Sequence, residues 1–279
     1  MNKPFLMKNI ALTLLTLFFI SVAVAQDTET PVDSTSYTTS NYMFDSTEVK
    51  PKNILKTNLS SIVFRNFSLT YERILTKRFS LSLGVRWMPD GGIPLIKTVE
   101  KVIGEESEDS TDEDLDDFIN NTTISGIAIT LEPRFYIGKG HGKGFYFAPY
   151  YRYSNFKFGD ITVNYDNEFN EEKEAFIGGT INAHSIGLMI GSQFNLGKNL
   201  VLDWWIIGGH YGKSSGTISG TPESPLSEYE QQEVKDSLED IALSNYIKEV
   251  NVDSTGIEVL IDGPWVGVRA FGFSLGYRF

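Results

Sequence analysis

Cysteine is absent from this 279-residue chain, which excludes a disulfide framework and a lipoprotein acylation site. Basic residues are also scarce: 24 lysines and arginines against 36 acids give a formal net charge of −12. Such a chain lacks the basic patches that bind nucleic-acid phosphates, so we predict no nucleic-acid partner.

Long apolar runs are missing beyond residue 22. A membrane-spanning helix needs about 20 apolar residues, so any membrane-embedded part must consist of strands. Before that point two lysines precede a shorter apolar run, and Ala23 and Ala25 give a small-residue cleavage pattern before Gln26. We predict a secretory signal peptide over residues 1–25. Cleavage of this peptide would remove two lysines from the chain and so change its net charge from −12 to −14.

The mature chain is expected to have two parts. Residues 26–50 are rich in serine, threonine and acids, which is typical of a disordered segment, here a periplasmic leader. Residues 51–279 are long enough for one domain with its own core.

The C-terminus ends on alternating residues with one apolar or aromatic face. This pattern fits the last strand of an outer-membrane barrel, whose apolar face meets lipid and whose final aromatic lies at the interface. A strand of a soluble sandwich alternates equally well. The predicted barrel-assembly signal consists of Phe271, Phe273, Leu275, Tyr277 and Phe279.

Eight alternating segments follow Pro51, and their connections differ by parity. Every long connection is odd-numbered, whereas the even ones are short, as expected for an up-and-down barrel with both termini in the periplasm. We therefore predict an all-β fold: an eight-stranded antiparallel transmembrane β-barrel with short periplasmic turns and long outer loops. The strands are expected near residues 53–63, 67–75, 79–88, 123–137, 145–158, 181–196, 200–212 and 264–279.

Two outer loops, 89–122 and 213–263, carry helical periodicity. Helices are expected over residues 94–103 and 225–248, the second capped by Thr221 or Ser224. They could pack together over the barrel mouth or offer a surface to a partner.

The inward faces of the expected strands are polar or small but include charges. Because an unpaired buried charge is costly, these residues should pair and plug the lumen, with Glu132 bound to Arg86, Arg134 or Arg152. A narrow channel with an ion pathway is the alternative. By the same parity Arg269 faces lipid, so either it lies high enough to reach outer-leaflet phosphates or a bulge turns it inward. The predicted lumen charge network consists of Lys56, Glu72, Arg86, Glu132, Arg134, Arg152 and Asp203.

Short motifs add a resemblance: NILKTNL (53–59), LTYER (69–73), EPRFY (132–136) and the terminal LGYRF (275–279). With them, the stretch from Asn53 to the end resembles the small outer-membrane barrels of Bacteroidetes, many of which are domains of unknown function. Its layout is similar to that of OmpA/OmpX-type barrels. The resemblance implies location and fold more than activity.

Two short stretches are similar to ligand-binding motifs, but the residues and elements around them do not fit those motifs. The glycine-rich stretch 138–144 lies between two strands, so it predicts a hairpin turn rather than a phosphate loop. The acidic stretch 105–117 lacks the glycine and glutamate of an EF-hand, although loose divalent-cation binding stays open. We predict no metal, cofactor or catalytic residue.

An enzyme is the remaining alternative. His184 lies next to Ser185, and His210 precedes Ser214 and Ser215. Parity puts both histidines on the lipid face at the outer rim, where a lipid A hydrolase would need a His–Ser pair. No orienting acid is evident.

The leading interpretation is a non-enzymatic outer-membrane protein of a Gram-negative bacterium. It would act structurally or bind a surface partner through loops 89–122 and 213–263. The other expected partners are outer-membrane lipid, lipopolysaccharide and the barrel-assembly machinery.

Overall fold

The computed structural model describes residues 51–92, 122–138, 140–166, 169, 171–239, 246–269 and 271–279. This part of the chain is all-β, as the sequence predicts, with one α-helix and one short 3-10 helix. Neither described helix is long and apolar enough to cross a membrane. The signal peptide, the leader, the helix expected at 94–103 and the acidic stretch 105–117 lie outside the described residues.

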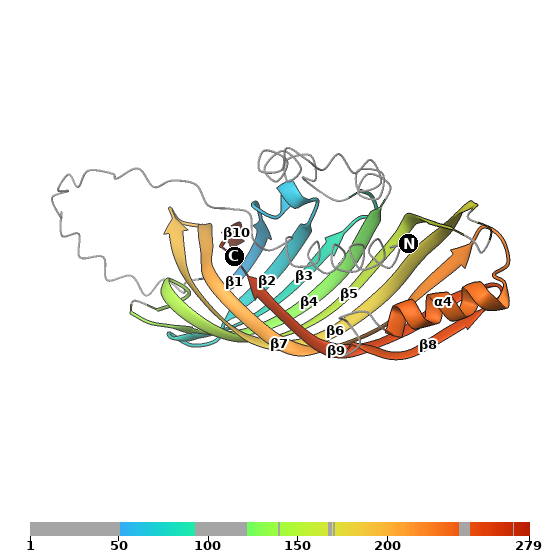
Figure 1. The fold of residues 1–279 in the computed structure, drawn as a ribbon. Coiled ribbons are helices and arrows are strands. Elements are labelled where there is room, and N and C mark those ends of the chain that lie inside the picture. Colours follow the sequence, from blue (N-terminus) through green and yellow to red (C-terminus); the bar gives the residue numbers. More distant parts are fainter. Residues whose placement is uncertain are drawn as a thin grey trace, which may run out of the picture.

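Ten antiparallel strands form one sheet in the order β10-β1-β2-β3-β4-β5-β6-β7-β9-β8 (Figure 1). The elements are β1 (Asn53–Asn58), η1 (Ile62–Phe64), β2 (Phe67–Ile74), β3 (Phe79–Met88), β4 (Thr123–Tyr136), β5 (Gly144–Asp166), β6 (Glu172–Leu196), β7 (Leu200–Pro222), α4 (Glu228–Glu239), β8 (Ile247–Asp253), β9 (Gly256–Arg269) and β10 (Gly272–Arg278).

The C-terminal strand closes eight of these strands into a ring. β10 pairs with β1 along one edge and with the first residues of β7 along the other. We call the pairing of β1 with β10 the closing seam. At one end of it the backbone groups of Asn53 and Phe279 exchange two hydrogen bonds, of 3.1 and 2.9 Å. We call the end of the ring that holds Asn53 and Phe279 its base.

The sheet continues well beyond the ring, which corrects two expected loops. The sequence predicts loops over residues 159–180 and 213–263, but β5 and β6 run on into a short turn, and β7, β9 and β8 stay paired. The apolar alternation fades in these segments, so it does not mark them as strands. Most backbone groups there pair with neighbouring strands, although β8 and the end of β5 are paired on one side only among the described residues. We call this part the extension.

The helix expected at 225–248 is shorter than predicted. α4 ends at Glu239, and residues 247–253 form a strand instead. The cap is Ser227, not Thr221 or Ser224: its hydroxyl accepts a hydrogen bond from the Glu230 amide, while the Glu230 carboxylate accepts one from the Ser227 amide. This reciprocal capping box starts the helix. α4 lies beside β8 (Figure 1).

Two irregularities reverse the side-chain alternation near the eighth strand. Where β6 pairs with β7, Ile190 of β6 lies opposite Ile207 and Gly191 lies opposite Trp205, so one residue of β7 is bulged out. A second break separates β9 from β10. A bulge inserts one residue and changes which side chains face inward. Consequently Arg269 and His210 lie on the interior side, and the prediction that His210 faces outward was wrong.

The burial pattern of the ring is the inverse of a soluble core. Charged and polar side chains fill the interior, and large apolar side chains face outward on every strand. Soluble monomers rarely expose a continuous apolar patch beyond a few hundred Å². The apolar belt consists of Leu69, Leu81, Leu83, Val85, Trp87, Ile127, Ile129, Leu131, Phe135, Phe147, Tyr151, Ile186, Leu188, Ile190, Phe194, Leu196, Ile207, Val266, Val268, Phe273, Leu275 and Tyr277.

Candidate functional site in the ring interior

Lys56 lies at the centre of a buried group of charges near the base of the ring. Its ammonium donates hydrogen bonds of 2.6 Å to Glu72, 2.6 Å to Asp203 and 2.9 Å to the Gln193 side chain. All four side chains are excluded from solvent. Three acceptors satisfy the three N–H donors of the ammonium, which is the condition for burying a lysine at low cost.

Arg134 joins the same acids from β4. Its guanidinium contacts Asp203 at 2.6 Å and Glu132 at 2.7 Å, and lies 3.5 Å from Glu72. The second oxygen of Glu132 accepts a hydrogen bond of 2.8 Å from Arg269 on β9. Three cations and three anions therefore balance. We call this set the ion-pair network: Lys56, Glu72, Glu132, Arg134, Asp203 and Arg269.

Tyrosines surround the network and separate it from the rest of the interior. Tyr136 donates a hydrogen bond of 2.7 Å to Glu72, and Tyr146 donates one of 2.8 Å to Asp203. The Arg134 guanidinium lies 4.6 Å from the centre of the Tyr146 ring. Tyrosine hydroxyls satisfy the acids and a tyrosine ring stacks on the arginine, so the network is held in one arrangement.

The glycine-rich turn closes the base of the ring, between β4 and β5. The carbonyl of Gly142 accepts hydrogen bonds from Gln193 (2.8 Å) and Arg278 (3.2 Å). Gly140 and Gly142 have φ of 68° and 67°, where a side chain is strained. A Cβ on Gly140 would lie 2.2 Å from the Lys77 carbonyl oxygen. Glycine is therefore needed for the turn to fold inward.

Of the seven charges expected in the lumen, the structure brings five together in the network. Arg86 and Arg152 are also on the interior face, but they form no ion pair among the described residues. Arg269 is not among the seven expected residues, although it belongs to the network. The sequence nevertheless contains a pattern that could have placed Arg269 in the interior. The outward apolar residues are even-numbered at Val266 and Val268 but odd-numbered from Phe271, which marks a change of parity.

The five residues of the predicted assembly signal all lie on the outer face of the ring. Phe271, Phe273, Leu275, Tyr277 and Phe279 are each more than a third exposed. Their alternation leaves Ser274, Gly276 and Arg278 inside, where Gly276 lies against the side chain of Lys56.

The two histidines do not form a hydrolase site in the described part of the chain. His184 faces outward and contacts the Tyr151 hydroxyl at 2.6 Å, whereas Ser185 faces inward. His210 contacts the Tyr150 hydroxyl at 3.1 Å, and the Ser214 hydroxyl donates to the Gly263 carbonyl. Among the described residues, neither imidazole has a serine or an acid within hydrogen-bond distance, so the geometry supports no nucleophile–base pair.

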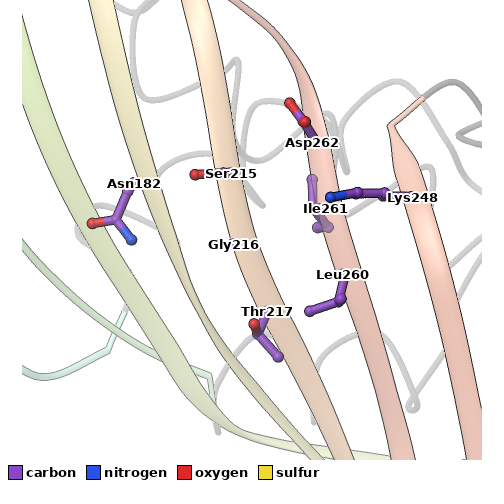
Figure 2. A pocket seen from close by; sticks show the side chains of 8 residues that line it. All are labelled: Asn182, Ser215, Gly216, Thr217, Lys248, Leu260, Ile261 and Asp262. Carbon is purple, nitrogen blue, oxygen red and sulfur yellow. The ribbon is translucent and has the colours of Figure 1, made fainter.

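A shallow hollow of about 340 Å³ lies on the extension rather than in the ring (Figure 2). Its lining is largely polar and comes from β6, β7, β8 and β9: Asn182, Ser215, Gly216, Thr217, Lys248, Leu260, Ile261 and Asp262. Asn182 accepts hydrogen bonds from Tyr153 and Asn155 of the next strand, which fixes it at the rim.

The described part of the interior holds paired charges, and its residues show no arrangement of catalytic groups. The network is buried and fully paired, and the described residues contain no group of acids and histidines that could hold a metal. No family model matches the sequence, and a search of curated proteins finds no match.

Proposed function

We propose that the chain is an integral outer-membrane β-barrel protein with a structural or surface-binding role and no enzymatic activity. The observation that carries the proposal is the inverse burial of the ring. A continuous apolar belt outside and a charged interior are stable when lipid surrounds the belt. In water the same belt would be a large aggregation-prone surface.

The height of the belt supports this proposal. On β6 the outward side chains from Ile186 to Leu196 are apolar except Ser192, which neighbouring side chains bury, and Tyr151 and His184 are in contact at the upper edge. The strand from Ile186 to Leu196 spans about 33 Å. At a strand tilt of about 40° this is about 25 Å along the membrane normal, the usual height of the apolar band of an outer-membrane barrel.

The extension supports a surface role. Above the belt the outward side chains become polar, as in the hollow of Figure 2. In this proposal the base of the ring, with its first and last residues Asn53 and Phe279, faces the periplasm, and the extension stands outside the cell. Its broad paired sheet would be the surface for a partner.

The two alternatives have less support. A narrow channel needs a continuous wet path, but the network and the glycine-rich turn fill the base of the ring. A lipid A hydrolase needs a His–Ser pair at the rim, and the inward turn of His210 removes the nearest candidate.

Site-directed spin labelling tests the membrane proposal, and the cysteine-free chain is a ready background. We expect a label at Leu83→Cys on the belt to be accessible to oxygen and protected from a water-soluble nickel complex, because oxygen partitions into lipid. A label at Ser215→Cys on the extension should show the opposite preference. Ser82→Cys, on the interior face, should be protected from both. Equal nickel access at positions 83 and 215 in reconstituted bilayers would contradict insertion.

A further inference from the structure

A second group of charges lies in the ring beyond the ion-pair network. Arg86 on β3 and Arg152 on β5 project from the interior face, and each adjoins a small or medium residue of β4, Ala128 and Thr130 respectively. Two strand spacings and an offset of two residues along β4 separate their backbone positions by about 12 Å, so the two long side chains can reach the same part of the interior. With His210 and Arg269 they form what we call the basic cluster.

Electrostatic interactions connect the members of this cluster. Arg86 and Arg269 repel each other, and Arg152 repels both. All three guanidinium groups also act on the His210 ring, so the four side chains lie within electrostatic range of one another. Arg269 lies over the rings of Tyr150 and Trp205, at 5.1 and 5.2 Å. The aromatic rings limit where its guanidinium can point.

The acids of the described interior cannot neutralise the basic cluster. Glu72, Glu132 and Asp203 are already balanced by the three cations of the network. Among the described residues of this region, Arg86 and Arg152 therefore leave two positive charges in excess. A third interior arginine, Arg278, lies apart from them at the base of the ring, where it donates to the His141 and Gly142 carbonyls. Buried charges without a counter-charge are costly, so the arrangement favours an added anion.

Arg152 gives the most specific indication that the basic cluster binds a ligand. Its side chain is buried, with the residue only 7 % exposed, and its Nε–H has no hydrogen-bond partner among the described residues. Buried polar groups are nearly always hydrogen-bonded. An oxygen of an anion would satisfy this donor and balance the charge at the same time.

We propose that the basic cluster binds a phosphate-type oxyanion inside the ring, held by Arg86 and Arg152 with Arg269 and His210 at its edge. Guanidinium groups match the geometry of phosphate oxygens and bind them through two parallel hydrogen bonds. The Tyr150 hydroxyl, which already contacts His210, fixes that imidazole beside the site. The phosphate could be free in solution or part of a lipid headgroup.

Thermal unfolding of the full-length protein in non-ionic detergent tests this inference, whatever the outcome for membrane insertion. Inorganic phosphate, titrated to about 20 mM at constant ionic strength so that screening does not change, should raise the Tm. Arg152→Gln and Arg86→Gln should each weaken the apparent affinity by about tenfold or more, because each removes a charged donor. Arg73→Gln, an exposed arginine on β2, should leave it unchanged.

The source of the phosphate is separated by a second titration. Mixed micelles containing a phosphorylated lipid A are compared with micelles of the dephosphorylated lipid. A Tm response to inorganic phosphate supports a free anion, and a response confined to the phosphorylated lipid supports a headgroup. No response in either titration, or equal responses in wild type, Arg152→Gln and Arg86→Gln, would overturn the proposal.

The stability of the variants without ligand provides an independent readout. If the cluster is an anion site, Arg152→Gln measured without added anion should unfold at a higher urea concentration than wild type, because an unpaired buried charge is removed. If Arg152 has only a structural role, Arg152→Gln should unfold at a lower urea concentration than wild type. A large loss of stability in both Arg152→Gln and Arg86→Gln would count against the anion site.

Discussion

Asp203→Asn is expected to lower the free energy of unfolding by about 3–5 kcal/mol, the usual cost of removing one partner from a buried charge group. Asp203 accepts hydrogen bonds from Lys56 and Arg134 with one oxygen and from Tyr146 with the other. An amide keeps the shape but loses the charge, and its NH₂ group would point at a donor. The network would then hold three cations against two anions.

Urea unfolding from a bilayer or detergent measures this loss. Glu258→Gln is the matched control, because Glu258 is an exposed acid on β9 outside the network. It should change stability by less than about 0.5 kcal/mol. Tyr146→Phe removes one hydrogen bond to Asp203 and should cost about 1 kcal/mol. Equal, small effects for Asp203→Asn and Glu258→Gln would show that the network is hydrated and contributes little.

Strand alternation makes the ring largely predictable from the sequence. A period-two pattern tells which side chains share a face, so it assigns Lys56, Glu72, Glu132, Arg134 and Asp203 correctly to one interior. It cannot tell which of them pair. Pairing depends on register between distant strands, such as β1 against β10, which no local pattern encodes.

The errors arise where one residue interrupts the alternation. The bulge near Trp205 and the break between β9 and β10 reverse the expected faces, which moves His210 and Arg269 inward. The extension escapes prediction for a different reason. Its strands carry polar residues such as Ser215 and Thr217 in place of an apolar face, so they lack the pattern by which strands are recognised.

The closing seam also explains why the last residue should matter for assembly. β10 connects β1 to β7, and without it both strands would present unpaired edges. Open edges expose backbone groups that cannot be satisfied in lipid and that pair with other chains in water. Phe279 ends this seam, with its side chain outward and its backbone paired to Asn53.

Phe279→Asp should therefore leave the protein exported but largely unassembled. A carboxylate at this position is unfavourable next to the apolar belt, and in the proposed outer-membrane setting it also removes the aromatic ring from the membrane interface. Phe279→Trp should assemble like wild type, because an interfacial aromatic is retained. Phe169→Asp, at an exposed aromatic in the β5–β6 turn at the opposite end of the sheet, should assemble normally as the matched control. The readout is heat-modifiable gel mobility of membrane fractions, which distinguishes a closed barrel from an unfolded chain. Wild-type mobility and yield for Phe279→Asp would show that the terminal aromatic has no part in closing the ring.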